Sequence, residues 1–113
     1  MDEDPAPPPD PEDPEVALRR AREQLISSFD DICEGVQRAI VEGPQALAAC
    51  RDSVHRLAGV AGMVGLPQVS ERALDLEAVL TGHAPGTGTV YSAVDQLRRA
   101  FSDDLAGPPP PWL

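Results

Sequence analysis

Residues 47–64 of the chain read LAACRDSVHRLAGVAGMV. Small or apolar side chains recur in this segment at intervals of 3, 4, 3, 4 and 3 residues: Leu47, Cys50, Val54, Leu57, Ala61 and Val64. This spacing places them on one side of an α-helix, because the helix completes a turn every 3.6 residues. Gly43 with Pro44 before the segment, and Gly65 with Pro67 after it, mark its ends. The segment therefore predicts one long amphipathic helix.

The same spacing predicts a helix before this segment and two helices after it. The first begins at Asp13, which can cap it, and Pro14, which suits a first helical position, and it ends at Gly43. The last ends before Gly107. The apolar positions of these helices are Leu18, Ala21, Leu25, Phe29, Ile32, Val36 and Ala39; Val69, Ala73, Leu76 and Leu80; and Val90, Val94, Leu97 and Phe101. No alternating strand pattern competes, so residues 14–106 predict an all-α, antiparallel up-down four-helix bundle.

Both ends of the chain are rich in proline. Residues 1–13 are acidic as well, and residues 107–113 read GPPPPWL. An acidic, proline-rich segment buries too little apolar surface to offset the entropy of ordering it, and prolines remove helix donors. We therefore expect disordered Pro-rich termini on either side of the bundle.

Charge and composition exclude several classes of function. The chain has 9 basic residues, all arginine, and 19 acidic residues, which gives a net charge of −10. This balance argues against a nucleic-acid-binding surface. No apolar run approaches the roughly 20 residues of a membrane span, and no secretory signal is evident. Two cysteines do not form a disulfide framework, so we expect a cytoplasmic protein. Four helices can close their own core, which favours a monomer.

The second predicted helix carries a histidine beside two glycines. His55 follows Val54 of the apolar seam, so it lies at the solvent edge, and Ala58, Gly59 and Gly62 follow on the same strip at i+3, i+4 and i+7. Each interior glycine destabilises a helix by about 1 kcal/mol relative to alanine. Either another helix packs closely here, or a second protein must approach the imidazole. The position of the strip, off the main seam, favours the second explanation.

Residues 55–80, HRLAGVAGMVGLPQVSERALDLEAVL, resemble histidine-containing phosphotransfer (HPt) domains, including those of chemotaxis-type histidine kinases. The pattern of that family is a histidine, an apolar residue two positions on, a lysine and then a glycine, with another glycine ten after the histidine. An acidic residue closes the next helix. The matching residues here are His55, Leu57, Gly59, Gly65 and Glu77. The lysine position holds Ala58, which departs from the pattern.

The resemblance implies a phosphoryl carrier that does not turn over a substrate alone. His55 would accept the phosphoryl group, and Glu77 would orient its ring. Arg51, one turn before His55, is our candidate for the phosphoryl contact that the missing lysine would make. The implied partners are a sensor histidine kinase and a response regulator receiver domain, and Mg²⁺ would belong to the receiver. The partner-docking surface would comprise Ala58, Gly59 and Gly62, rimmed by Val60 and Met63.

Other interpretations compete with this one. A non-catalytic helical adaptor or inhibitor could bind a kinase or receiver domain without using the histidine, and the absent lysine favours it. Cys33, Cys50, His55 and His83 are too widely spaced in sequence for a zinc site, so we expect no metal and no cofactor. No GxxxxGK[ST], GxSxG or HExxH motif occurs, so the sequence motifs indicate no kinase or hydrolase site.

Overall fold

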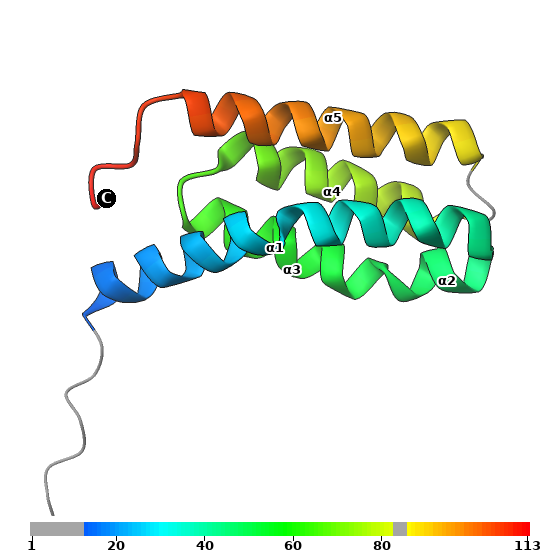
Figure 1. The fold of residues 1–113 in the computed structure, drawn as a ribbon, viewed down its shortest axis with the longest axis horizontal. Helices are drawn as coiled ribbons and strands as arrows, with labels where there is room; N and C mark the ends of the chain where they lie inside the picture. The colour runs from blue at the N-terminus through cyan, green and yellow to red at the C-terminus, as the bar shows by residue number, and fades with distance from the viewer. Residues whose placement is uncertain (1–12, 83–85) are drawn as a thin grey trace, which may run out of the picture.

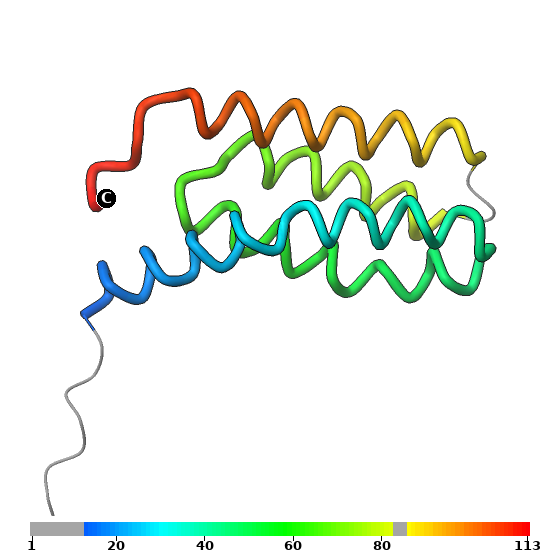
Figure 2. The backbone as a smooth tube through the Cα atoms, in the orientation of Figure 1, coloured from blue at the N-terminus to red at the C-terminus, as the bar shows by residue number. Residues whose placement is uncertain are grey.

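The structure, a computed structural model, describes residues 13–82 and 86–113. This part of the chain forms the helices α1 (Pro14–Glu42), α2 (Pro44–Ala49), α3 (Arg51–Met63), α4 (Pro67–Thr81) and α5 (Thr87–Ala106). The chain reverses direction after α1, after α3 and after α4 (Figure 1), and the tube in Figure 2 follows the same course. The predicted all-α, up-down four-helix bundle is confirmed.

The predicted second helix is divided in the structure into α2 and α3. Cys50 stands between them, and its backbone N–H donates to the Leu47 carbonyl at 3.1 Å, three residues back. Such an i→i−3 bond is a single tighter turn of the 3₁₀ type. Cys50 keeps right-handed helical angles, and its carbonyl accepts from Val54 N–H at 3.1 Å. The two segments therefore occupy one place in the bundle.

The apolar stripes of the helices meet in one core. Phe29 of α1 stacks on Phe101 of α5 with ring centroids 3.9 Å apart. Val54 and Leu57 of α3 and Leu76 of α4 are buried in the same cluster. At about 25 cal/mol per Å² of apolar surface removed from water, this burial is the main stabilising contribution. It also fixes the rotation of each helix about its axis, and thus which residues reach the surface.

The C-terminal segment differs from the disordered tail that we expected. A Cβ added to Gly65, in the α3–α4 turn, would lie 2.9 Å from Cγ of Pro110. Trp112 packs against the core, and its carbonyl accepts from Arg19 Nη2 at 3.3 Å. Trp112 and Pro110 thus find contacts with the bundle that a composition argument does not foresee. The expected acidic tail and His83 lie outside the described residues, apart from Asp13, which caps α1 as predicted.

None of the helices that the structure describes is long and apolar enough to cross a membrane.

Candidate functional site

His55 stands on the surface of α3. Its side chain is 69% exposed, although its neighbours Val54 and Leu57 are buried. The phase of the apolar stripe explains this placement, because a residue one position past a buried one is turned by about 100° around the helix. The ring is therefore held at mid-bundle by a helix whose other face is in the core.

Glu77 of α4 contacts the His55 ring. Nδ1 of His55 lies 2.9 Å from Oε1 and 3.0 Å from Oε2 of Glu77, whose side chain is 24% exposed. A carboxylate only accepts hydrogen bonds, so in the neutral imidazole this partner assigns the proton to Nδ1 and leaves the lone pair on Nε2. Within residues 13–82 and 86–113, Nε2 has no hydrogen-bond partner. The arrangement presents a nucleophilic nitrogen to solvent.

The start of α4 is capped by a residue that is distant in sequence. Leu66 occupies the N-cap position and has no side chain suited to capping. Asp104 of α5 takes over this role, since its Oδ2 accepts from the buried Val69 N–H at 2.8 Å. Sequence reasoning missed Asp104 because no local motif links it to a helix 35 residues earlier. The contact fixes the end of the helix that carries Glu77.

Removing this cap should weaken the fold. We expect Asp104→Ala to lower the free energy of unfolding by about 1–3 kcal/mol, because a buried donor loses its acceptor. Asp104→Asn keeps one acceptor oxygen and should lose less. The exposed neighbour serves as the control: Asp103→Ala should change stability by less than about 0.5 kcal/mol. Denaturant unfolding followed by circular dichroism measures all three, and equal losses for Asp103 and Asp104 would contradict the capping role.

Arg22 of α1 contacts the C-terminal end of α3. This buried guanidinium donates to the Val64 carbonyl at 2.7 Å and also contacts the Gly65 carbonyl at 3.4 Å. A cation at a helix C-terminus satisfies carbonyls that lack intrahelical partners and complements the helix dipole. Gly65 has φ +78°, which a residue with a side chain rarely adopts. Arg22 was not singled out from sequence, because its apolar-stripe position gives no sign of its partner.

The two glycines near His55 are in different surroundings. A Cβ on Gly59 would meet no atom within 4 Å, so this position is open to solvent. A Cβ on Gly62 would lie 3.3 Å from Oγ of Ser70 on α4. Gly59 therefore has no packing reason within the described chain to lack a side chain, whereas Gly62 allows close approach of α4.

The structure corrects one part of the predicted docking surface. Ala58 is only 3% exposed, because its place on the strip turns it toward α4 and the core. Its methyl group is therefore not available to a partner. Met63 is 67% exposed and Val60 is half-buried. Leu74 of α4, which sequence reasoning missed, is 51% exposed one turn before Glu77.

Arg51 lies one turn before His55 on the same face of α3 and is exposed. It makes no hydrogen bond or ion pair with any part of the chain that the structure describes. Its guanidinium is thus unengaged and within one helical turn of the imidazole. The structure brings Glu77 into contact with the ring and leaves Arg51 beside it without a contact.

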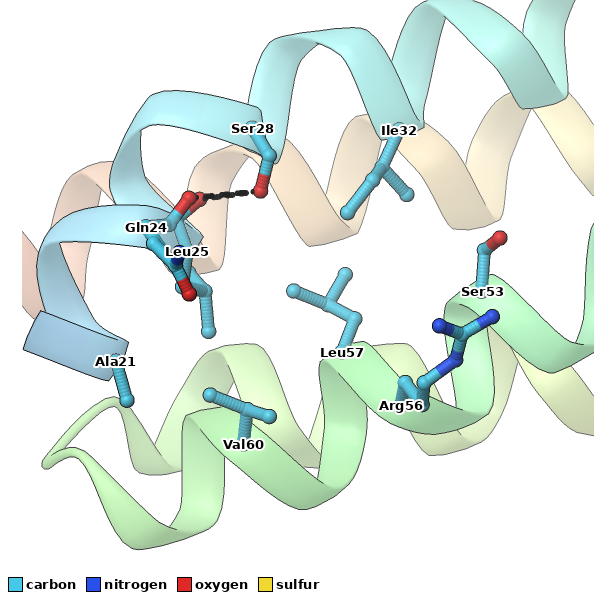
Figure 3. Close-up of a pocket in the computed structure, with 9 residues that line it drawn as sticks. All are labelled: Ala21, Gln24, Leu25, Ser28, Ile32, Ser53, Arg56, Leu57 and Val60. Atoms are coloured by element: carbon cyan, nitrogen blue, oxygen red, sulfur yellow. Dashed lines mark hydrogen bonds between the residues drawn. The ribbon is translucent and has the colours of Figure 1, made fainter. Parts of the chain in front are cut away.

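A groove lies between α1 and α3 (Figure 3). Its volume is about 340 Å³. Residues of both helices, drawn in Figure 3, line it: Ala21, Gln24, Leu25, Ser28 and Ile32 from α1, and Ser53, Arg56, Leu57 and Val60 from α3. Val60 thus contributes to the wall of this groove.

Neither cysteine is suited to nucleophilic chemistry. Burial raises the pKa of the Cys33 thiol to about 11, and it also raises the pKa of Cys50. Both thiols are therefore neutral near pH 7, and a neutral thiol is a poor nucleophile. In the described residues, no group of three or more histidine, cysteine or acidic side chains is arranged to hold a metal ion. His55 remains the nucleophilic candidate.

The comparisons with known proteins agree with this geometry. The sequence model of the Hpt domain matches residues 20–105, which covers α2, α3 and α4, most of α1 and nearly all of α5. Searches of curated proteins and of solved structures gave no match. An exposed histidine at mid-bundle and a family match that spans most of the chain lead to one conclusion: the chain belongs to the Hpt domain family, whose role is histidine phosphotransfer in phosphorelays.

Proposed function

We propose that the protein carries a phosphoryl group on Nε2 of His55. The group would come from a sensor histidine kinase or from a receiver aspartyl phosphate, and it would pass to a response regulator. The observation that supports this proposal most directly is the exposed ring whose Nδ1 lies 2.9 Å from Glu77. In the neutral ring that contact places the proton on Nδ1 and the lone pair on Nε2, as attack on phosphorus requires.

The transfer step uses few groups of this chain. The Nε2 lone pair forms a bond to phosphorus, and the bond from phosphorus to the aspartyl oxygen breaks, so its electron pair returns to the carboxylate. The phosphorylated ring keeps its Nδ1 proton and becomes a cation, which the Glu77 carboxylate stabilises. The receiver supplies Mg²⁺ and the acidic pocket that holds the metal. The HPt protein contributes no cofactor, and it acts as a cytoplasmic monomer in this proposal.

Arg51 supplies positive charge next to the phosphoryl group in this mechanism. The family lysine position is taken by the buried Ala58, and the chain contains no lysine. A guanidinium is always charged and presents several donors in a fixed plane, which suits phosphoryl oxygens. Arg51 is unengaged and shares the His55 face, so it serves better than Arg56, which lines the α1–α3 groove.

The docking surface surrounds the ring on two helices. Gly59 lets a partner backbone approach α3, and Met63 and Leu74 offer exposed apolar contacts. Gly62 lies at the edge where α4 packs. A surface of this kind combines a bare helical turn with apolar side chains, which suits docking of a folded receiver domain.

Phosphotransfer from a receiver tests the proposed function. A receiver domain from the same genome is phosphorylated with a radioactive donor and mixed with the protein. We expect label on this chain that is lost in acid and retained in alkali, as a phosphoramidate bond to histidine requires. Label that survives acid, or no label from any receiver or kinase of that genome, would contradict the proposal.

The carboxylate of Glu77 should affect the rate of transfer. We expect Glu77→Ala to slow phosphotransfer about 10- to 100-fold, by analogy with the loss when a carboxylate that orients a metal-bound histidine is removed. Glu77→Gln keeps an acceptor for Nδ1–H but removes the charge, so its transfer rate should lie between those of wild type and Glu77→Ala. Rapid-quench labelling measures these rates. Equal rates for wild type and Glu77→Ala would exclude Glu77 from the mechanism.

A further inference from the structure

Two side-chain hydrogen-bond contacts cross from α3 to α4 in the described part of the chain. One joins His55 and Glu77. In the other, the Ser70 hydroxyl of α4 donates to the Ala58 carbonyl of α3 at 2.8 Å. The helices lie side by side along their length (Figure 1). The second contact has no place in the chemistry described above, and it was not anticipated from the sequence.

The Ser70 contact lies on the same seam as the His55–Glu77 pair. Ser70 precedes Glu77 by seven residues, two helical turns, so both side chains lie on one face of α4. Ala58 follows His55 by three residues on the face of α3 that turns toward α4. The hydroxyl thus links the two helices next to the pair that aligns the imidazole.

Gly62 makes this link possible. A Cβ at Gly62 would lie 3.3 Å from Ser70 Oγ and 3.8 Å from Ser70 Cβ. A Cβ contact at 3.3 Å is tight, so a side chain at Gly62 would push the Ser70 hydroxyl by a few tenths of an ångström from its present place beside the Ala58 carbonyl. Because Gly62 has no side chain, Ser70 can pack against α3 next to the buried Ala58.

We propose that Ser70 is a positioning residue for the phosphotransfer histidine. Its hydrogen bond to the Ala58 carbonyl, beside Gly62, sets the register of α4 against α3. This register brings Glu77 to Nδ1 of His55. The physical reason is the sensitivity of that pair to sliding. One residue of helix corresponds to a rise of about 1.5 Å, and a hydrogen bond of 2.9 Å weakens steeply when its atoms separate by a fraction of that distance. Apolar packing resists separation of helices, but it is less directional than a hydrogen bond.

Ring-nitrogen NMR of the free protein tests this role without any partner. We expect ¹⁵N spectra of wild type to show His55 protonated at Nδ1, and Ser70→Ala to shift the ring toward the Nε2-protonated form. Gly62→Ala should shift it in the same direction. Ser70→Thr keeps the hydroxyl and should restore the wild-type spectrum. Ser28→Ala removes a half-buried hydroxyl bonded only within α1, and it should change nothing.

A double-mutant cycle tests the coupling to Glu77. This arm rests on the proposed phosphotransfer, whereas the NMR arm does not. We expect Ser70→Ala to slow transfer about 10-fold in wild type, the lower end of losses for residues that orient a functional histidine. In a Glu77→Ala background the same substitution should have no further effect, because its target is absent.

Several results would overturn the positioning role. An unchanged His55 tautomer in Ser70→Ala would do so, as would equal shifts in Ser70→Ala and Ser70→Thr. A loss of about 10-fold that persists in the Glu77→Ala background would show that Ser70 acts through general stability instead. If no label reached His55 from any donor but the tautomer shifted as expected, the phosphorelay proposal would fail and the positioning role would stand.

Discussion

His55→Gln is expected to abolish phosphoryl labelling of the protein while leaving its fold intact. Glutamine has no nucleophilic ring nitrogen, so the label should fall to the background of a sample without receiver. The fold should persist because the His55 side chain is 69% exposed and contributes little to the core. Labelling by a phosphorylated receiver, with thermal unfolding measured in parallel, checks both expectations.

The second histidine of the chain provides the matched control. His83→Gln should be labelled as fast as wild type, since His83 is assigned no part in the transfer. Label that persists in His55→Gln and disappears in His83→Gln would move the phosphorylated residue to His83. A loss of label in both variants would point to a change in folding, which the unfolding measurement detects.

The adaptor hypothesis predicts a different outcome for the same position. An adaptor would bind its kinase or receiver equally well after His55→Ala. Even the wild-type protein would then accept no phosphoryl label. The buried Ala58 at the family lysine position is the feature that favours this alternative. Measuring both partner binding by calorimetry and phosphoryl labelling separates the carrier hypothesis from the adaptor hypothesis. A labelled wild-type protein excludes an adaptor that does not use the histidine.

Gly59→Gln is expected to slow phosphotransfer about 100-fold, the scale of loss that small misplacements of reacting groups cause. A glutamine side chain one turn beyond His55 would occupy space that the partner backbone needs. The free energy of unfolding of Gly59→Gln should nevertheless rise. No atom lies within 4 Å of a Cβ added at this position, and glycine disfavours a helix interior by about 1 kcal/mol relative to alanine or similar residues.

The matched controls use other substitutions in open helical positions. A Cβ added to Gly35 of α1 would also meet no atom within 4 Å, so Gly35→Gln should raise stability without slowing transfer. Gly59→Ala should also be more stable by about 1 kcal/mol, with a smaller loss of rate than Gly59→Gln. Normal transfer by Gly59→Gln would show that no partner approaches this turn. Slow transfer by Gly35→Gln would show that added helix stability itself impairs transfer.

The sequence anticipated most of the candidate site through helical phase. The buried positions of Val54 and Leu57 placed His55 at the surface, and the i+4 position placed Gly59 beside it. Glu77 was anticipated differently, by resemblance to HPt domains, because no rule of local spacing connects residues 22 positions apart on two helices. The same argument wrongly predicted that Ala58 is accessible to a partner. Ala58 lies on the edge of the strip that faces α4, and it is buried there.

The sequence by itself determined the helical class, the order of the helices and the exposure of His55, because apolar periodicity and the Gly–Pro breaks act within a few residues. Only the tertiary structure decided which distant polar groups meet: Asp104 on the start of α4, Arg22 on the end of α3, and Ser70 on the Ala58 carbonyl. Each of these contacts depends on the rotation and register of two packed helices. Those quantities are set by the whole core at once, so no local segment of the sequence contains them.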